Sequence, residues 1–324
     1  MYCTKTLKYN NNKKSIMRKI IILYILFLFI ISCTGHETVV VDRESTIPSD
    51  AIKITPETDA NPVKSLTAEY SDPVPVLYPI STAGAEDSPF IMPDGNTIYF
   101  FFTPDVRIPA EKQVIDSVTG IYVSHKQGDS WTKPERVVLQ DNGKLSLDGC
   151  FFAKDNYALF CSAREGYTGI HWFSAEYVDN IWQNWENADD VVRTAEYNTG
   201  ELHIFNDELY FHAKNSDGNN DLWISKKVNG EWSQPENVAA MNTASDEGYP
   251  ALNPQGTELW FSRDYAVWRS KKVNEQWQQP ERMFSPLAGE PSIDTQGNVY
   301  FVHHYFSNNV MIEADIYVAS KTKI

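Results

Sequence analysis

Positive charge is scarce in this 324-residue sequence, which has 28 Lys and Arg against 43 Asp and Glu and a formal net charge of −15. Such a chain repels phosphate backbones, and no stripe of Lys or Arg with interleaved aromatic residues offsets that repulsion. We therefore expect no nucleic-acid partner. Cationic ligands, metals and neutral sugars remain compatible with the charge.

Motifs for nucleophilic or nucleotide chemistry are also missing. The sequence contains no G-x-S-x-G, no P-loop and no G-x-G-x-x-G within a βαβ unit. Its histidines show neither H-x-x-x-H nor H-x-H spacing, so the pattern predicts no metal centre and no cofactor. Any catalysis would have to use carboxylates.

Long apolar runs are absent except near the N-terminus. There a basic head at Arg18-Lys19 precedes the apolar run from Ile20 to Ile31, which is too short for an ordinary spanning helix. This layout is typical of a secretory signal peptide, which we place at residues 1–32 with Met17 as an alternative start. A plain signal anchor is the other interpretation.

The end of this segment, Ile30-Ile31-Ser32-Cys33, resembles the lipobox of bacterial lipoproteins. The resemblance implies cleavage before Cys33, acylation of that cysteine and a lipid anchor on a membrane of the bacterial cell envelope, facing the periplasm or the exterior. Residues 33–66 are rich in Thr, Glu, Asp, Val and Pro without a sustained period, so we expect a flexible tether.

Beyond the tether the sequence is repetitive. Aromatic-rich strand segments recur about every 50 residues, and Trp-x-x-Pro-Glu follows three of them. A period of roughly 40–50 residues made only of strand-like runs is typical of β-propeller blades. The segments end at Ser124, Ser174, Ser225, Ser270 and Ala319, and the Trp motifs begin at Trp131, Trp232 and Trp277, with a looser copy at Trp185.

Each unit predicts four strands, which in the first unit cover roughly 87–92, 97–103, 119–125 and 131–139. The fifth unit lacks its last strand. Tyr70-Ser71-Asp72-Pro73 has the same aromatic-x-x-Pro form as the Trp motif, and we expect the strand after it to pair with Asp315–Ser320. The predicted fold is all-β: a five-bladed β-propeller of four-stranded blades over residues 67–324, closed by an N-terminal strand that completes the last blade.

The segments SPFIMPDGNTIYFF (Ser88–Phe101) and NTASDEGYPALNPQGTELWFS (Asn242–Ser262) resemble PD40 or TolB-type "WD40-like" propeller repeats of exported bacterial proteins. The resemblance covers about residues 70–324 and implies a β-propeller in the cell envelope. Units two and three have lost the Pro-Asp-Gly turn but keep the strand-turn-strand order.

In a propeller, the start of the first strand and the end of the second strand of every blade share one mouth. Acids and bases therefore gather there, where they can bind a glycan, a peptide or a partner protein. Alternatively, the acids accept backbone N–H bonds, the histidines fill aromatic positions and the arginines neutralise the ring. The acids are Glu86, Asp87, Asp148, Glu201, Asp246, Glu247 and Glu290, and the bases are Arg164, His212, Arg263, His303 and His304.

The leading hypothesis is a lipid-anchored, non-enzymatic binding module with carbohydrate as one ligand class. The alternative is a carboxylate-based glycoside hydrolase or another polysaccharide-cleaving enzyme. Five-bladed glycoside hydrolases use a base, a modulator and an acid from the first three blades, and Asp87, Asp148 and Glu201 stand in that order.

Cys150 and Cys161 are the only cysteines outside the N-terminal region. If Asp155-Asn156 forms a two-residue turn, they face each other across a hairpin at a hydrogen-bonded position, where side chains are poorly aimed at one another. The spacing permits a disulfide, but we expect two buried free thiols.

Overall fold

The computed structural model describes residues 41–322, and all structural statements below concern this part of the chain. The predicted signal peptide, Cys33 and the start of the predicted tether lie outside the described residues. Within residues 41–322, no helix has the length and apolar character needed to cross a bilayer.

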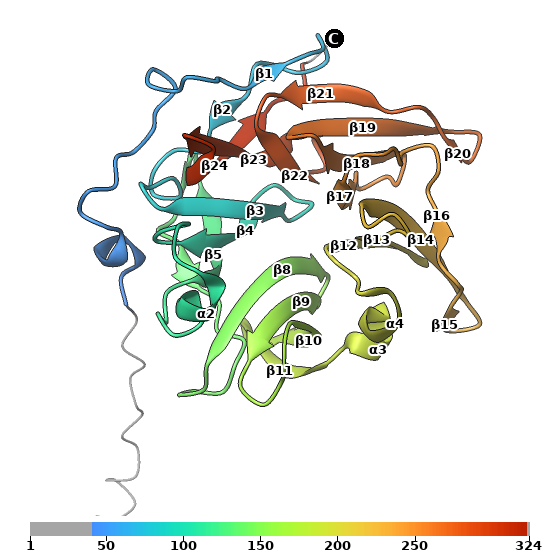
Figure 1. The fold of residues 1–324 in the computed structure, drawn as a ribbon, viewed down its shortest axis with the longest axis horizontal. Helices are drawn as coiled ribbons and strands as arrows, with labels where there is room; N and C mark the ends of the chain where they lie inside the picture. Colours follow the sequence, from blue (N-terminus) through green and yellow to red (C-terminus); the bar gives the residue numbers. More distant parts are fainter. Residues whose placement is uncertain (1–40, 323–324) are drawn as a thin grey trace, which may run out of the picture. The chain divides into compact units, whose positions relative to one another are not determined.

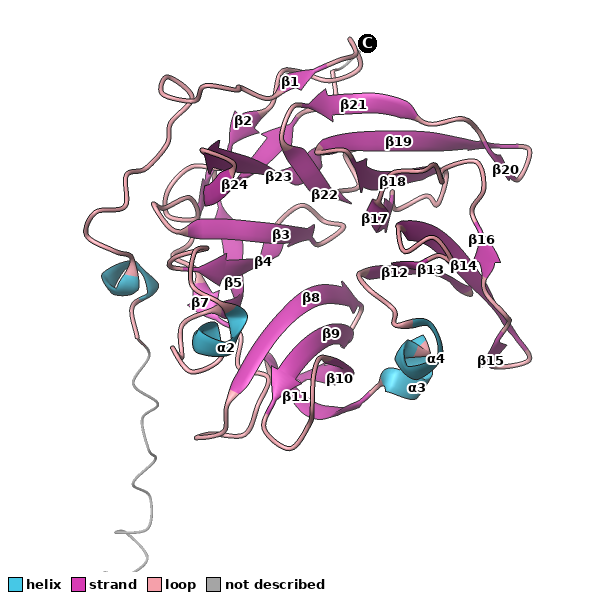
Figure 2. Ribbon diagram, in the orientation of Figure 1, coloured by secondary structure: helices cyan, strands magenta, loops and turns pink. Residues whose placement is uncertain are grey.

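The described chain is all-β and consists of antiparallel strand groups that follow one another in sequence (Figures 1 and 2). The first two groups are β3 (Ala85–Ile91), β4 (Thr97–Thr103), β5 (Gly120–Gln127), β6 (Ser130–Trp131) and β7 (Glu135–Arg136), then β8 (Ser146–Lys154), β9 (Tyr157–Arg164), β10 (His171–Val178) and β11 (Ile181–Asn187). The third is β12 (Leu202–Phe205), β13 (Glu208–Lys214), β14 (Asn220–Val228), β15 (Glu231–Trp232) and β16 (Glu236–Asn237).

Two further groups complete the fold. The fourth is β17 (Glu247–Leu252), β18 (Glu258–Arg263), β19 (Ala266–Val273), β20 (Gln276–Trp277) and β21 (Glu281–Ser285), with β1 (Lys64–Ser65) at its edge. The fifth is β22 (Ala288–Ile293), β23 (Val299–Ser307) and β24 (Val310–Ala319), with β2 (Val74–Pro75) at its edge. A single parallel pairing, Ala314 with Ala85, joins the fifth group to the first in one nine-stranded sheet.

In residues 41–322, helical structure is limited to single turns. These are η1 (Arg43–Thr46), α2 (Ala110–Gln113), α3 (Asp189–Val192) and α4 (Thr194–Tyr197). The first strands of the groups lie nearest the middle of the view in Figure 1, where β3 contacts β8 and β22, and β17 contacts β12 and β22. Side chains that start these strands can therefore meet although they are far apart in sequence.

A hydrogen bond explains the serine that ends the repeated strand segment. The hydroxyl of Ser225 is buried and donates to the carbonyl of Ser233, just beyond Trp232, at 2.7 Å. Ser124 makes the same bond to Thr132 at 2.7 Å. The serine and the tryptophan recur together because the serine hydroxyl binds the carbonyl of the residue that follows the tryptophan.

Proline interrupts the fourth strand of three groups. The predicted strand 131–139 is instead two short pieces, β6 and β7, on either side of Pro134, because proline lacks the N–H that a continuous ladder requires. The looser second copy has no proline at this point, and its fourth strand β11 is continuous.

The N-terminal strand pairs with the last group as predicted. In β2, Val74 pairs with Val318 and Pro75 with Tyr317, and a separate bridge joins Tyr70 to Lys321. The Tyr70–Lys321 bridge corresponds to the pairs Lys126–Trp131, Lys227–Trp232 and Lys272–Trp277 of the other groups. Tyr70 thus occupies the tryptophan position of the repeat.

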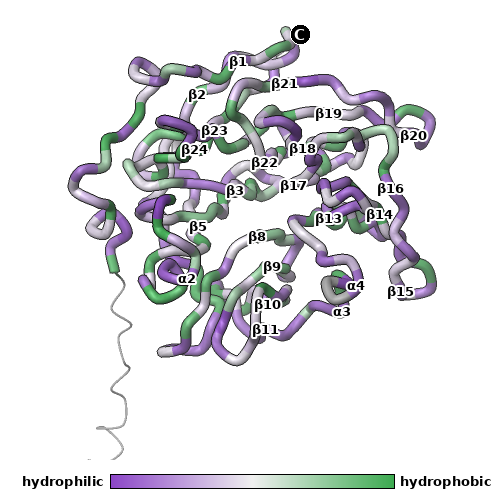
Figure 3. Tube along the Cα trace, viewed as in Figure 1, coloured by the Kyte–Doolittle hydropathy of each residue, from purple (hydrophilic) through white to green (hydrophobic). Residues whose placement is uncertain are grey.

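The core consists of apolar side chains packed between neighbouring groups. Phe284 stacks on Trp260 at 6.2 Å and on Phe301 at 5.0 Å between ring centroids, which connects β21 to β18 and β23. Figure 3 shows hydrophobic and hydrophilic residues mixed along the strands and not gathered in long runs, as expected when alternate side chains face different surroundings.

The predicted tether is wrong for residues 41–66, which pack against the strand groups. Arg43 is buried, lies over the Phe102 ring at 4.7 Å and forms an ion pair with Glu86 at 2.9 Å. Lys53 forms ion pairs with Glu313 and Asp315, and β1 pairs with β21. These contacts join residues far apart in sequence, so the low-periodicity composition of the segment did not indicate them.

Candidate functional site

A β-bulge interrupts the first strand in four of the five groups. The register shifts after Asp87, Gly149, Gly248 and Gly289, and the next residue has a positive φ of 46° to 56°. In the third group Glu201 follows Gly200 at the corresponding place. The four bulge residues are Ser88, Cys150, Tyr249 and Glu290, and Glu201 takes the corresponding place in the third group.

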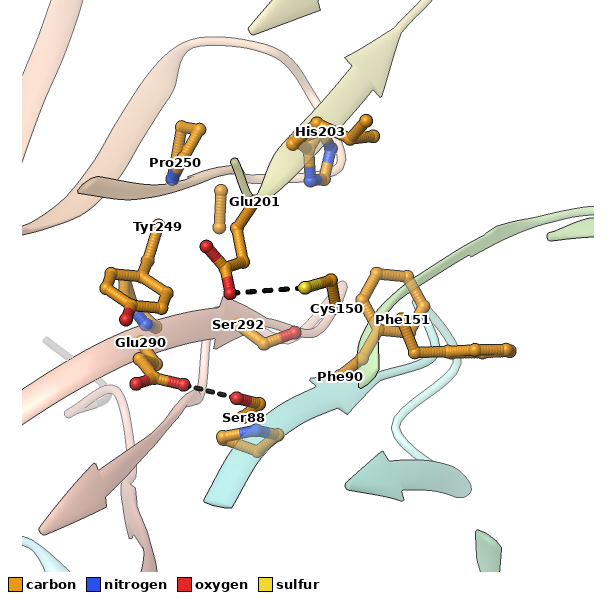
Figure 4. A pocket seen from close by; sticks show the side chains of 14 residues that line it. Ser88, Phe90, Cys150, Phe151, Glu201, His203, Tyr249, Pro250, Glu290 and Ser292 are labelled. Atoms are coloured by element: carbon orange, nitrogen blue, oxygen red, sulfur yellow. Dashed lines mark hydrogen bonds between the residues drawn. The ribbon is translucent and has the colours of Figure 1, made fainter. Parts of the chain in front are cut away.

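These five residues line one narrow cavity of about 60 Å³ (Figure 4). A bulge turns a side chain away from the strand alternation, and left-handed φ is strained for residues other than glycine. Because the bulge is repeated from group to group, one side chain from each of these first strands points toward the same cavity. We call this cavity the waist.

A larger cavity of about 630 Å³ adjoins the waist, and Tyr249 and Glu290 line both. We call it the upper cavity. Its wall carries both charge and aromatic rings. The other polar and aromatic lining residues include Asp87, His212, Asp246, Glu247, Arg263, Tyr265, His304 and Phe306.

Ser88 holds two carboxylates of this region. Its hydroxyl donates to Glu290 Oε2 at 2.5 Å, and its backbone N–H donates to Asp87 Oδ1 at 2.8 Å. Burial, followed by the negative charges of Asp87 and Glu201, raises the pKa of Glu290 well above its usual range. The charge of Glu290 in turn is the largest cause of a raised pKa at Tyr249.

His212 bridges two neighbouring first strands. Its Nδ1 accepts the Tyr249 N–H at 3.3 Å, which leaves the ring proton on Nε2, and Nε2 lies 3.4 Å from Glu201 Oε2. The ring fills the space beside Gly200, where a Cβ would lie 2.1 Å from Nε2. The position of His212 therefore requires glycine at residue 200.

Tyr265 lies in the hairpin turn between β18 and β19 and is 57% exposed. Both turn residues, Asp264 and Tyr265, have φ of 51°, a conformation that bulky side chains rarely adopt. Its ring meets Phe306 edge-on at 5.7 Å. The strained turn therefore places an exposed aromatic ring at the wall of the upper cavity.

Three predicted acids have structural partners. Glu86, Asp148 and Glu247 occupy one repeat position and are buried, each paired with an arginine and a Ser or Thr hydroxyl. For example, Asp148 accepts Ser162 Oγ at 2.6 Å and Arg164 Nη2 at 2.9 Å. Glu247 and its partner Arg263 still reach the upper cavity, whereas Glu86, Asp148 and Arg164 line neither the waist nor the upper cavity.

The predicted residues therefore separate into two sets. Asp87, His212, Glu290 and His304 meet at the upper cavity, and Glu201 joins them from the waist. His303 faces elsewhere: it is buried, its Nε2 lies 3.1 Å from Asp59, and burial lowers its pKa. The structure does not bring together Asp87, Asp148 and Glu201, because Asp148 lies outside both cavities.

Sequence reasoning missed Ser88, Tyr249 and Tyr265. A signal for the first two existed: proline follows the bulge residue in three groups, as Ser88-Pro89, Tyr249-Pro250 and Glu290-Pro291. Tyr265 had no such signal.

The expectation of two free thiols is wrong, because Cys150 and Cys161 form a disulfide with a Cα–Cα distance of 5.2 Å. The bulge shifts the register so that Gly149, and not Cys150, lies opposite Cys161. The hydrogen-bonded cross-strand geometry that disfavoured a bridge therefore does not exist. The bridge lies at the waist, where Cys150 Sγ is 3.4 Å from Glu201 Oε1 (Figure 4).

Another cavity, of about 540 Å³, lies on the other side of the waist and shares Phe90, His203, Ala251 and Ser292 with it. Its wall is mainly apolar and includes the turns after the first strands. Burial lowers the pKa of His203 to about 3, so this imidazole is neutral. The two large cavities therefore differ in character, and the polar one is the candidate site.

No protein-family model matches the sequence, and no curated protein matches it. Solved structures with a similar fold include a protein of unknown function from Dyadobacter fermentans, with 10% identity over 81% of this chain and 100% of that one and a TM-score of 0.48. A sialidase from Trypanosoma rangeli has 11% identity over 75% of this chain and 46% of its own, with a TM-score of 0.39.

An α-L-arabinofuranosidase from Podospora anserina has 10% identity over 76% of this chain and 95% of its own, with a TM-score of 0.39. The chain spans about half the length of the sialidase. The two glycoside hydrolases are β-propellers. At such low identity these similarities concern the fold and assign no activity to this chain.

Proposed function

We propose that the protein is a lipoprotein of the bacterial cell envelope, anchored through Cys33, whose five strand groups form a closed five-bladed β-propeller that binds a glycan in the upper cavity. The observation that carries the glycan proposal is the wall of that cavity, where Tyr265, Tyr249 and Phe306 stand beside Asp87, Glu290 and His212.

Sugars require this combination of groups. Aromatic rings cover the apolar face of a pyranose, while carboxylates and imidazoles accept or donate hydrogen bonds to its hydroxyls. The upper cavity, at about 630 Å³, falls within the usual size range of small-molecule sites and has room for a short oligosaccharide. The strained turn at Tyr265 supports the proposal, because the ring occupies an exposed position that folding alone does not require.

The anchor and the PD40 or TolB-type family remain part of this proposal. The lipobox-like ending at Cys33 supports the anchor, and the pairing of β2 with β24 supports closure of the ring.

A glycan array probed with the purified protein tests the ligand class. We expect binding to at least one glycan, confirmed by calorimetry, and an affinity loss of about 10-fold or more in Tyr265→Ala. The matched control is Tyr167→Ala, since Tyr167 is also exposed but does not line the upper cavity. Absence of glycan binding, or equal binding by Tyr265→Ala, would leave a peptide or protein as the ligand and overturn the proposal.

The alternative function is glycoside hydrolysis, with Glu290 replacing the predicted Asp148. Oxygens of Asp87 and Glu290 lie within 4.8 Å of each other, nearer to the roughly 5 Å separation of retaining glycosidases than to the 6.5–9.5 Å of inverting ones. Incubating the array hit with the protein and measuring new reducing ends distinguishes the two functions. Release that disappears in Glu290→Gln would favour the enzyme.

A further inference from the structure

Three possible metal ligands meet in the wall of the upper cavity. Asp87 from β3, Glu290 from β22 and His304 from β23 each offer one donor atom, and these atoms all lie within 4.8 Å of one another. All three side chains are partly buried. Strands of two different groups therefore bring two carboxylates and an imidazole to one point.

The repeat pattern is broken at this point. Glycine precedes the bulge in three other groups, as Gly149, Gly248 and Gly289, and Gly200 stands at the corresponding place in the third group. Only the first group has a side chain there, Asp87. The bulge residue that lies beside Asp87 is Glu290, from the fifth group. A carboxylate beside a second carboxylate is electrostatically unfavourable, and a bound cation would remove that repulsion.

Ser88 donates to one oxygen of each carboxylate. Its N–H donates to Asp87 Oδ1 and its hydroxyl donates to Glu290 Oε2, so Ser88 does not occupy the other oxygen of either group. Outer hydrogen bonds of this kind orient ligands in known metal sites. One serine thus fixes both carboxylates toward the same place.

His304 adds an independent observation. Its Nδ1 is shielded from solvent and has no hydrogen-bond partner within the described residues. The rings of Tyr265 and Phe306 pack against the His304 ring, with centroids 6.1 and 6.5 Å from its centroid. An unpartnered polar atom of this kind is costly unless a ligand satisfies the ring.

We propose that Asp87, Glu290 and His304 bind one divalent transition-metal ion, Zn²⁺ or Mn²⁺. One nitrogen and two oxygens suit such ions, whereas Ca²⁺ prefers six to eight oxygens. Ligands about 2.1 Å from a tetrahedral ion lie about 3.4 Å apart, so the donor atoms, which lie within 4.8 Å of one another, must approach by up to about 1.4 Å. The remaining coordination positions face the upper cavity.

This inference goes beyond glycan binding and changes the expectation of no metal that the histidine spacing supported. Spacing rules describe ligands on one helix or strand, whereas these three come from strands separated by up to about 200 residues. A metal at this place would also occupy the carboxylates that hydrolysis needs, so metal binding and the alternative function compete.

Calorimetry with metal ions in the absence of sugar tests the site. Because no sugar is present, a negative result does not affect the glycan proposal. The purified full-length protein is stripped with chelator and titrated with ZnCl₂, MnCl₂ and CaCl₂. We expect saturable binding of one Zn²⁺ or Mn²⁺ per chain and a roughly 100-fold weaker affinity in Asp87→Asn and His304→Gln. Co²⁺ should give a visible absorption spectrum that the variants lose.

The control variant is His125→Gln, because His125 is exposed and its side chain hydrogen-bonds only to Thr97 among the described residues. Melting temperatures of the metal-free proteins check folding, and Asp87→Asn, which keeps the side-chain shape, carries the test if His304→Gln does not fold. No saturable uptake by the wild type, uptake of Ca²⁺ alone, or equal affinity in the site variants and the control would overturn the proposal.

Discussion

The Nε2 atom of His212 lies 3.4 Å from Oε2 of Glu201, and this contact within the third strand group connects a residue of the upper cavity with a residue of the waist. It depends on the missing side chain of Gly200, because a Cβ there would lie 2.1 Å from Nε2. The same repeat position in the second group, Gly149, has room: its nearest neighbour would be Cys161 Sγ at 3.6 Å.

The two glycines therefore make a matched pair of variants. Gly200→Ala should displace His212 and destabilise the protein by about 1–3 kcal/mol, the usual cost of overpacking. Gly149→Ala should change stability by less than about 1 kcal/mol, since alanine fits and costs less chain entropy than glycine. Urea denaturation measures both, and equal stability of the two variants would contradict the assigned role of Gly200.

The Cys150–Cys161 disulfide is the second target. Its sequence separation of 11 closes a short hairpin, for which loop entropy predicts a stabilisation of about 3 kcal/mol. The double variant Cys150→Ser/Cys161→Ser should unfold at correspondingly lower denaturant. Thiol titration of denatured, unreduced protein should find as many thiols in the wild type as in the double variant; two more in the wild type would mean that the bridge does not form.

Much of this fold could be predicted from sequence because its repeated contacts are local. The hydrogen bond from Ser225 to the carbonyl of Ser233 spans eight residues. Because both partners lie in one short segment, the same residues recur in the sequence wherever the contact recurs. The Tyr70–Lys321 bridge is not local, but its strand pairing was indicated because Tyr70 and Pro73 copy the Trp-x-x-Pro motif of the other groups.

The candidate site was only partly predictable, because one extra residue in a bulge changes which side chains face the centre. Glu86 and Asp87 are neighbours in sequence, yet Glu86 is buried against Arg43 while Asp87 lines the upper cavity. The pairing of Arg43 with Glu86 spans 43 residues and has no periodic signal, which is why the tether interpretation failed.

The buried carboxyl of Glu313 predicts a pH dependence of stability. Burial raises its pKa to about 7, although Lys53 opposes the shift. A folded-state pKa above the unfolded value favours folding below about pH 4.5, and this contribution is lost as pH rises through about 7. Denaturation at several pH values should show that Glu313→Gln reduces the loss of stability over this range by on the order of 2 kcal/mol.

Part of that loss should persist in Glu313→Gln, because burial also raises the pKa of Glu86 to about 7. Glu111→Gln, at an exposed position, is the control and should keep the wild-type profile. A Glu313→Gln profile that coincides with the wild type would show that this carboxyl does not titrate in the range.

The proposed anchor predicts a change in location. Cys33→Ser should remove the acylation site and release the protein from membranes, because the sequence has no other long apolar run. Membrane fractions washed in high salt and probed for the protein measure this. Cys3→Ser should remain in the membrane pellet, and retention of Cys33→Ser in that pellet would contradict the lipid anchor.

The proposed closure of the ring by the N-terminal strand gives the last prediction. Tyr70 is buried and meets Trp260 and Phe284 edge-on, with ring centroids 5.7 and 5.5 Å away. Tyr70→Ala should therefore cost about 3–5 kcal/mol, as for other large aromatic residues removed from a core. Leu77→Ala, in the same segment but 72% exposed, should cost little.

Deleting residues 68–78 should go further and unfold the described domain, because β24 would lose its edge partner and Trp260 its covering ring. Circular dichroism melting distinguishes these outcomes. The order of melting temperatures should run from wild type and Leu77→Ala, through Tyr70→Ala, to a deletion variant with no cooperative transition. A deletion variant that melts like the wild type would show that the fifth strand group does not depend on this segment.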